Sequence, residues 1–115
     1  MKHVLIVDDD YDICESLLLV LEDRYRVSTA YNGLQALSIL EQDTVDAVVL
    51  DLMMPILDGE STLREMHARG WSVPVILASA ANHLPAKARS SGAAGWIQKP
   101  FDVTDLEDAL ARALP

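Results

Sequence analysis

Near its N-terminus the chain reads Val4-Leu5-Ile6-Val7-Asp8-Asp9-Asp10, four apolar residues followed directly by three carboxylates. A short, continuous apolar run is typical of a strand that is buried on both faces of a parallel sheet. The abrupt change to acidic residues places carboxylates at the strand's carboxyl end, which is the edge where open α/β sheets bind ligands. This stretch therefore predicts both a fold class and a position for the functional site.

Further apolar runs follow at regular spacing, and helix-period segments lie between them. The runs are 27–30, 47–50, 75–78 and 95–97, and the helical segments are marked by Ile13, Cys14, Leu17, Leu18 and Leu21; Leu34, Leu37 and Leu40; Leu63 and Met66; and Leu106, Ala109, Leu110, Ala113 and Leu114. Parallel strands need crossover connections, and right-handed crossovers place helices on both faces of the sheet. We therefore expect an α/β fold, an open doubly wound five-stranded parallel sheet, (βα)5, with strand order 2-1-3-4-5.

Two helix starts are predicted from capping patterns. Asp12 and Glu15 have the spacing of a capping box for the first helix, and Thr104 and Glu107 have it for the last. Asp10 is a second candidate for starting or capping the first helix.

Length and composition indicate one domain. The chain has 115 residues, half of them hydrophobic, which suffices for a core without disulfides or structural metal. We expect one domain over residues 1–115, with no effector domain, linker or repeat in this chain. The single cysteine, Cys14, excludes an intrachain disulfide and suits a reducing cytoplasm.

Net charge and hydropathy argue against nucleic acid and membrane as binding partners. The formal net charge of −9 repels nucleic-acid phosphates, so we expect no direct nucleic-acid binding. The apolar run 4–7 is too short for a signal peptide or a membrane span, so we expect a cytoplasmic protein without membrane insertion. The three histidines, His3, His67 and His83, lack metal-ligand spacing and are expected at the surface.

Polar residues end four of the predicted strands. Besides Asp8-Asp9-Asp10 they are Asp51, Ser79 and Lys99. In the order 2-1-3-4-5, ligands bind between strands 1 and 3, where the acidic strand ends meet. Carboxylates about 4–5 Å apart repel by several kcal/mol at an effective dielectric of about 20, so the cluster needs a cation. Oxygen ligands with room for water suit Mg²⁺, and a carboxylate nucleophile with Mg²⁺, a lysine and a hydroxyl suits phosphoryl transfer.

These motifs, in this order, resemble the receiver domain of two-component response regulators over essentially the whole chain. The matching stretches are 7–10, Asn32-Gly33-Leu34-Gln35-Ala36-Leu37, Asp51-Leu52-Met53-Met54-Pro55-Ile56-Leu57-Asp58-Gly59, Pro74-Val75-Ile76-Leu77-Ala78-Ser79-Ala80 and Gly95-Trp96-Ile97-Gln98-Lys99-Pro100-Phe101.

The resemblance implies a role for each matched residue. Asp51 is the phosphoacceptor, and Asp9, Asp51 and the backbone carbonyl of Met53 bind Mg²⁺, with Asp8 acting largely through a metal-bound water. Ser79 and Lys99 hold the phosphoryl oxygens.

The resemblance also implies a switch and partners. Trp96 takes the position of the switch aromatic, which turns inward as Ser79 moves, and the Lys99–Pro100 bond is cis. The donor is a sensor histidine kinase or a histidine phosphotransfer protein, and homodimerisation on phosphorylation is one expected response. Only self-catalysed phosphotransfer and dephosphorylation are expected, so the chain is not an enzyme with its own substrate turnover.

Two departures from the family pattern concern the output face, the surface that includes the fourth helix and through which family members usually pass on the signal. The segment between Ser79 and Trp96 is about two residues short, and it contains Asn82, Pro85 and the stop at 90–92, which predicts a short fourth helix. The switch aromatic is Trp rather than Tyr or Phe, and a half-buried strand residue without a gating role is the alternative.

Met53 and Ala81 occupy the positions that, by analogy with the family, tune water access to the acyl phosphate. The apolar Met53 and the small Ala81 predict a slow to moderate rate of phosphate loss.

Rival interpretations remain open. A haloacid-dehalogenase-type phosphatase would use Asp8 as its nucleophile, but it leaves Asp51 without a task and the chain without a cap domain. A receiver-like interaction module would never be phosphorylated. A flavodoxin is disfavoured because the first strand is followed by carboxylates rather than a phosphate-binding loop. The sequence leaves open a stand-alone regulator, a phosphorelay shuttle and a piece of a longer protein.

Overall fold

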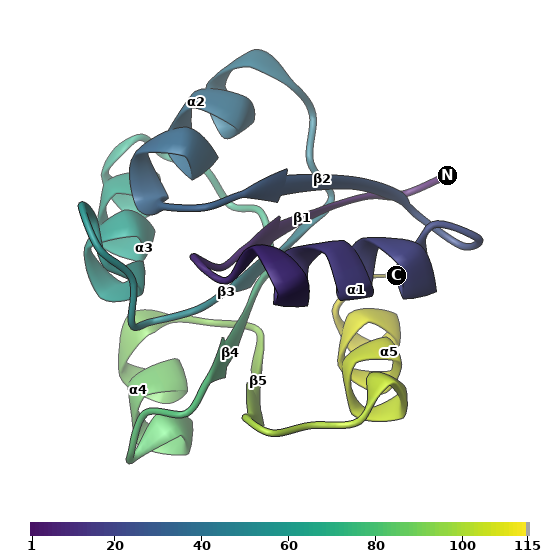
Figure 1. Cartoon of the computed structure of the whole chain (residues 1–115). Coiled ribbons are helices and arrows are strands. Elements are labelled where there is room, and N and C mark those ends of the chain that lie inside the picture. Colours follow the sequence, from purple (N-terminus) through teal and green to yellow (C-terminus); the bar gives the residue numbers. More distant parts are fainter. Residues whose placement is uncertain (115) are drawn as a thin grey trace.

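The computed structural model describes residues 1–114, in which strands and helices alternate (Figure 1). The elements are β1 (His3–Val7), α1 (Tyr11–Leu21), β2 (Arg26–Ala30), α2 (Gly33–Gln42), β3 (Ala47–Leu50), α3 (Gly59–Ala68), β4 (Val75–Ser79), α4 (Leu84–Ser91), β5 (Gly95–Gln98) and α5 (Val103–Ala113). Pro115, the last residue of the predicted domain, lies outside the described residues.

The five strands form one sheet in the order β2-β1-β3-β4-β5, and every neighbouring pair is parallel. The predicted fold class and strand order are therefore confirmed. Because all strands run the same way, the residues that follow β1, β3, β4 and β5 meet at one edge of the sheet.

The three central strands, β1, β3 and β4, are buried because helices cover both sheet faces (Figure 1). Successive strand residues point to opposite faces, so Leu5 and Val7 pack in one core layer while Val4 and Ile6 pack in the other. The first layer includes residues of α2, α3 and α4, and the second includes residues of α1 and α5. This double cover explains the continuous apolar runs of the sequence.

The first helix begins earlier than the capping pattern predicted. Asp10 is the N-cap of α1, and its carboxylate accepts hydrogen bonds from the backbone N of Asp12 at 2.9 Å and of Ile13 at 3.3 Å. The predicted Asp12–Glu15 capping box is wrong, because Asp12 already lies inside the helix. The alternative, that Asp10 caps the helix, is confirmed.

The last helix shows the same error. Its N-cap is Asp102, whose backbone N donates to the carboxylate of Asp105 at 3.3 Å. The predicted start at Thr104 with Glu107 is wrong, because α5 already begins at Val103 and Thr104 lies in its first turn. In α1 the Asp10 carboxylate accepts from free backbone N–H groups of the first turn, whereas in α5 the Asp105 carboxylate accepts from the backbone N of the N-cap.

His3 is not a surface residue. Its side chain is buried in β1, where Nδ1 lies 2.8 Å from the Thr44 carbonyl oxygen and Nε2 lies 2.7 Å from Ser28 Oγ. The prediction failed because both ring nitrogens find partners from distant segments, which sequence spacing does not reveal. His67 and His83 are exposed, as predicted.

Helix α4 has eight residues, which confirms the prediction of a short fourth helix. In α2, by contrast, Leu34 is 57% exposed, so it does not belong to the apolar face that its spacing suggested. Ala36 and Leu37 carry the buried face of that helix. Within residues 1–114, no helix combines the length and apolarity that crossing a membrane requires.

Candidate functional site

Three carboxylates converge at the carboxyl edge of the sheet. Asp8 and Asp9 follow β1, Asp51 follows β3, and each offers an oxygen within 4.8 Å of the others. The neighbouring strands fix this arrangement, since the backbone N of Asp51 donates to the Val7 carbonyl oxygen at 3.0 Å. Asp8 and Asp51 are buried while Asp9 is exposed, so the cluster opens to solvent beside Asp9.

Lys99 completes the cluster from the end of β5. Its Nζ lies 2.5 Å from Asp8 Oδ2 and 3.2 Å from Asp51 Oδ2, so one ammonium bridges two buried carboxylates. The Lys99–Pro100 bond that follows is cis, as expected. The strand-end positions of Asp8, Asp9, Asp51 and Lys99 are thus brought together, as the sequence suggested.

Burial and charge shift the titration of this pair. Burial raises the pKa of Asp8 above its ordinary value, although the hydrogen bond from Lys99 acts in the opposite direction. Burial by itself lowers the pKa of Lys99. The hydrogen bond to Asp8 and the charges of Asp51 and Asp8 outweigh this effect, so the pKa of Lys99 lies above its ordinary value. Lys99 therefore stays positively charged, while the raised pKa of Asp8 makes its carboxyl harder to ionise than an exposed aspartate.

The backbone around Asp51 is tightly packed. The backbone N of Met53 donates to Asp51 Oδ1 at 3.2 Å, and the backbone N of Gly59 donates to the Leu52 carbonyl oxygen at 3.0 Å. A Cβ on Gly59 would lie 2.3 Å from the backbone oxygen of Asp51 and 2.7 Å from the Cα of Leu52. Only glycine therefore fits where the start of α3 contacts Asp51.

Ser79 and Trp96 lie on neighbouring strands but in different environments. Ser79 is fully buried, and its hydroxyl accepts a hydrogen bond from the backbone N of Ala81 at 3.2 Å. Trp96, on β5, is 43% exposed. The roles predicted for Ser79, Trp96 and the Met53 carbonyl remain predictions. The side chain of Met53, in the loop after β3, is exposed.

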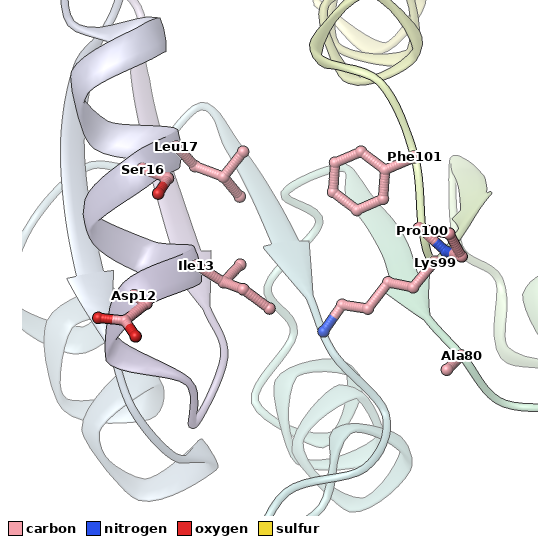
Figure 2. A pocket seen from close by; sticks show the side chains of 8 residues that line it. All are labelled: Asp12, Ile13, Ser16, Leu17, Ala80, Lys99, Pro100 and Phe101. Carbon is pink, nitrogen blue, oxygen red and sulfur yellow. The ribbon is translucent and has the colours of Figure 1, made fainter.

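An apolar groove of about 520 Å³ lies beside the cluster, between α1 and the segment after β5. Figure 2 shows Ile13 and Leu17 of α1 on one side and Phe101 and Lys99 on the other. Lys99 lines this groove and also bonds to Asp8 and Asp51, so the groove borders the acidic cluster.

The donor set fits a metal cation. Asp8, Asp9 and Asp51 carry three negative charges when ionised and Lys99 carries one positive charge, which leaves two negative charges without a partner in the cluster. Oxygen ligands with this surplus charge suit a hard divalent cation. The exposed side of Asp9 leaves room for the waters that such an ion retains.

Comparison with known proteins identifies the class. The family model described as response regulator receiver domain matches residues 4–111. The chain belongs to this family, whose members are phosphorylation-dependent switches of two-component signalling.

Curated relatives support the assignment. Response regulator MprA of Mycobacterium avium is 37% identical over 113 residues, which cover 96% of this chain and 48% of that protein. The chain therefore spans about half the length of the curated relatives it matches.

Solved structures match the fold along the whole chain. Chemotaxis protein CheY4 of Vibrio cholerae superposes with a TM-score of 0.91 at 28% identity, covering 99% of each chain. Response regulator TrrA of Thermotoga maritima, solved in complex with Mg²⁺-BeF, gives 0.89 at 31% identity, covering 99% of this chain and 100% of that one.

Two contacts near the site have only weak signals in the sequence. Gln98 donates from Nε2 to the Ala81 carbonyl oxygen at 3.3 Å, and the sequence pattern of β5 does not predict this contact. Gly59 had a signal, since it follows Asp58 in the motif after Asp51, but its packing role needed the tertiary structure.

Proposed function

We propose that residues 1–115 form a receiver domain in which Asp51 accepts a phosphoryl group from a phosphohistidine. The observation that carries this proposal is the position of the Asp51 carboxylate, which lies within 4.8 Å of Asp8 and Asp9 oxygens and 3.2 Å from Lys99 Nζ. A buried carboxylate beside a cation site and a lysine is equipped to attack phosphorus.

The transfer exchanges one bond to phosphorus for another. A carboxylate oxygen of Asp51 forms the new P–O bond while the P–N bond of the phosphohistidine breaks. The leaving imidazole nitrogen keeps the bonding electron pair and takes up a proton from solvent. The reaction needs no oxidant, and the chain turns over no substrate of its own, because the product remains attached to Asp51.

Asp9, Asp51 and the Met53 carbonyl would hold Mg²⁺ in this proposal, and Asp8 would act through water. Asp8 is already hydrogen-bonded to Lys99, which supports an indirect role, while the exposed Asp9 lies on the solvent side. When bound, Mg²⁺ neutralises charge on the phosphoryl oxygens during transfer. Lys99 would shift its hydrogen bond from Asp51 to a phosphoryl oxygen.

Phosphorylation would act as a switch through Ser79 and Trp96. The added group brings close to two negative charges and three acceptor oxygens to Asp51. Ser79 would turn its hydroxyl toward one of these oxygens and release the Ala81 backbone N. Trp96 would then turn into the space that opens, and the surface of α4, β5 and α5 would change.

The donor would be a sensor histidine kinase or a histidine phosphotransfer protein, and the reaction would take place in the cytoplasm. The groove between α1 and Phe101 supports docking of such a donor, since a donor helix with apolar side chains could seat beside Ile13 and Leu17 and bring its phosphohistidine to the acidic pocket. Homodimerisation after phosphorylation belongs to the same proposal.

Acetyl phosphate with Mg²⁺ tests the proposal, read by intact mass, peptide mapping and size-exclusion chromatography. We expect one phosphoryl group on Asp51, none on the Asp51→Asn variant, and wild-type labelling of the Asp23→Asn control, an exposed carboxylate after α1. Label on Asp8 would instead support the phosphatase, and no label with any donor would support an unphosphorylated interaction module. A change in elution volume would report dimerisation.

A further inference from the structure

The loop that follows β4 is held by side chains from two neighbouring strands. The hydroxyl of Ser79 accepts from the backbone N of Ala81 at 3.2 Å, and Gln98 Nε2 donates to the carbonyl oxygen of Ala81 at 3.3 Å. Both polar backbone groups of Ala81 are therefore bonded, one to the end of β4 and the other to the end of β5.

Sheet register places Gln98 at this position. Gln98 pairs directly with Ser79, and the backbone N of the next residue, Lys99, donates to the Ser79 carbonyl oxygen at 2.9 Å. Gln98 is exposed, so burial in the core does not account for where its amide points. Its outward orientation on β5 is the same as that of Trp96, two residues earlier.

The start of α4 contributes little local anchoring to this loop. The N-cap is His83, which has a left-handed backbone with a φ of 59°. In the described part of the chain its side chain makes no capping hydrogen bond, so the first N–H groups of α4 lack that support. The bonds of Ala81 to Ser79 and Gln98 are consequently important restraints on the loop.

We propose that Gln98 is a positioning residue that stabilises the resting conformation of this loop and so opposes the turn of Ser79 toward a phosphoryl group. The inference rests on the proposed function, in which Ser79 leaves Ala81 when Asp51 is phosphorylated. Because Gln98 holds Ala81 in place, Ser79 can turn only by giving up its hydrogen bond to the Ala81 backbone N, whereas a released Ala81 could move with it and keep that bond. The Ser79–Ala81 bond is then present only in the resting state and shifts the equilibrium toward that state.

The Gln98→Met variant tests this, because methionine has nearly the same length but no N–H donor. We expect its affinity for beryllium fluoride with Mg²⁺ to rise about two- to fivefold, the effect of one partly exposed hydrogen bond. Its initial rate of labelling by acetyl phosphate should rise in parallel. The matched control is Gln42→Met, at the exposed end of α2, which should bind like wild type.

A second readout separates failure of this inference from failure of the proposed function. Without Mg²⁺ or beryllium fluoride, the amide resonance of Ala81 should shift in Gln98→Met and stay unchanged in Gln42→Met. Unchanged or weaker beryllium fluoride binding by Gln98→Met would overturn the inference. Tighter binding by Gln98→Ala but not by Gln98→Met would also overturn it, because the loss of side-chain volume rather than of the hydrogen bond would then be responsible. If wild type itself binds no beryllium fluoride, the proposed function fails, and the Ala81 resonance still decides whether Gln98 anchors the loop.

Discussion

Lys99 Nζ lies 2.5 Å from Asp8 Oδ2, so the lysine that ends β5 is bonded first to the strand that opens the chain. Its second contact, with Asp51 Oδ2, is longer at 3.2 Å. In the resting pocket the ammonium group of Lys99 is therefore paired mainly with Asp8, beside the proposed phosphoacceptor Asp51. A cation or a phosphoryl group entering the pocket would compete with this pair.

Replacing Lys99 by Met should destabilise the metal-free protein. The variant leaves Asp8 and Asp51 buried without their shared cation, which costs about 2–4 kcal/mol of unfolding free energy. Urea unfolding with and without Mg²⁺ measures this cost, and Mg²⁺ should recover more stability in the variant than in wild type. Lys2→Met, at the exposed N-terminus, is the matched control. Equal stability of the Lys99 variant and wild type would show that the ion pairs contribute nothing net.

Asp58 should make the start of α3 sensitive to acid. Its carboxylate accepts from the backbone N of Ser61 at 2.8 Å, and this bond holds the pKa of Asp58 below its ordinary value of 3.8. The folded-state pKa is the lower one, so the stabilisation is complete above 3.8 and disappears as the pH falls through the folded-state pKa.

The Asp58→Ala variant should lose about 1 kcal/mol of unfolding free energy at neutral pH, the usual cost of removing an N-cap. The difference from wild type should shrink in strongly acidic solution. Asp58→Asn, an uncharged cap, should show no such pH-dependent loss. Thermal unfolding across the pH range measures both effects, and a difference that stays constant with pH would contradict the proposed titration.

Ile56 should be a site where glycine stabilises the fold. It has a φ of 72°, in the left-handed region that β-branched residues avoid, and its side chain is 73% exposed. Relief of backbone strain should exceed the entropy cost of glycine, so Ile56→Gly should gain about 1 kcal/mol. Ile56→Ala keeps the positive φ and should gain less. Urea unfolding compares the variants, and a less stable glycine variant would show that the isoleucine side chain contributes packing.

Gly59 and Gly95 form a matched pair for testing the support of Asp51. A Cβ on Gly59 would lie 2.3 Å from the Asp51 backbone oxygen, whereas one on Gly95 would meet nothing within 4 Å in the described structure. Gly59→Ala should therefore move the loop after β3, costing about 2 kcal/mol of stability and weakening Mg²⁺ binding. Gly95→Ala should leave Mg²⁺ binding unchanged. Calorimetric Mg²⁺ titration reads the site, and equal affinities for the two variants would argue against close packing at Gly59.

Cys14 should be unreactive while the protein is folded. Burial raises the pKa of its thiol to about 11, with the nearby Asp8 charge adding to the shift, and its residue is only 1% exposed. Because the thiolate is the reactive form, a chromogenic disulfide reagent should react very slowly at about pH 8 and rapidly after unfolding. Rapid labelling of the folded protein would show that α1 opens away from β1.

The sequence predicted the elements whose signals are local. Continuous apolar runs predicted strands covered on both faces, and the alternation of runs and helical segments predicted the strand order. Polar residues at strand ends predicted the meeting of Asp8, Asp9 and Asp51, because parallel strands deliver their carboxyl ends to one edge. The short α4 was likewise readable from its proline, serines and glycine.

The errors of prediction arose where several residues compete for one role. Asp10 rather than Asp12 caps α1, and Asp102 rather than Thr104 caps α5, since spacing alone does not choose among nearby acceptors. The burial of His3 depends on Thr44 and Ser28, which are far away in the chain.

By itself, then, the sequence determined the parallel sheet and the acidic strand ends. Hydrophobic periodicity is a property of neighbouring residues, and a helix between two strands is the crossover that makes them parallel. Only the tertiary structure decided that Lys99 bonds to Asp8 more closely than to Asp51, and that Gln98 anchors Ala81. These contacts join positions separated by many residues, and hydrogen bonds depend on distances and directions that only the packed sheet establishes.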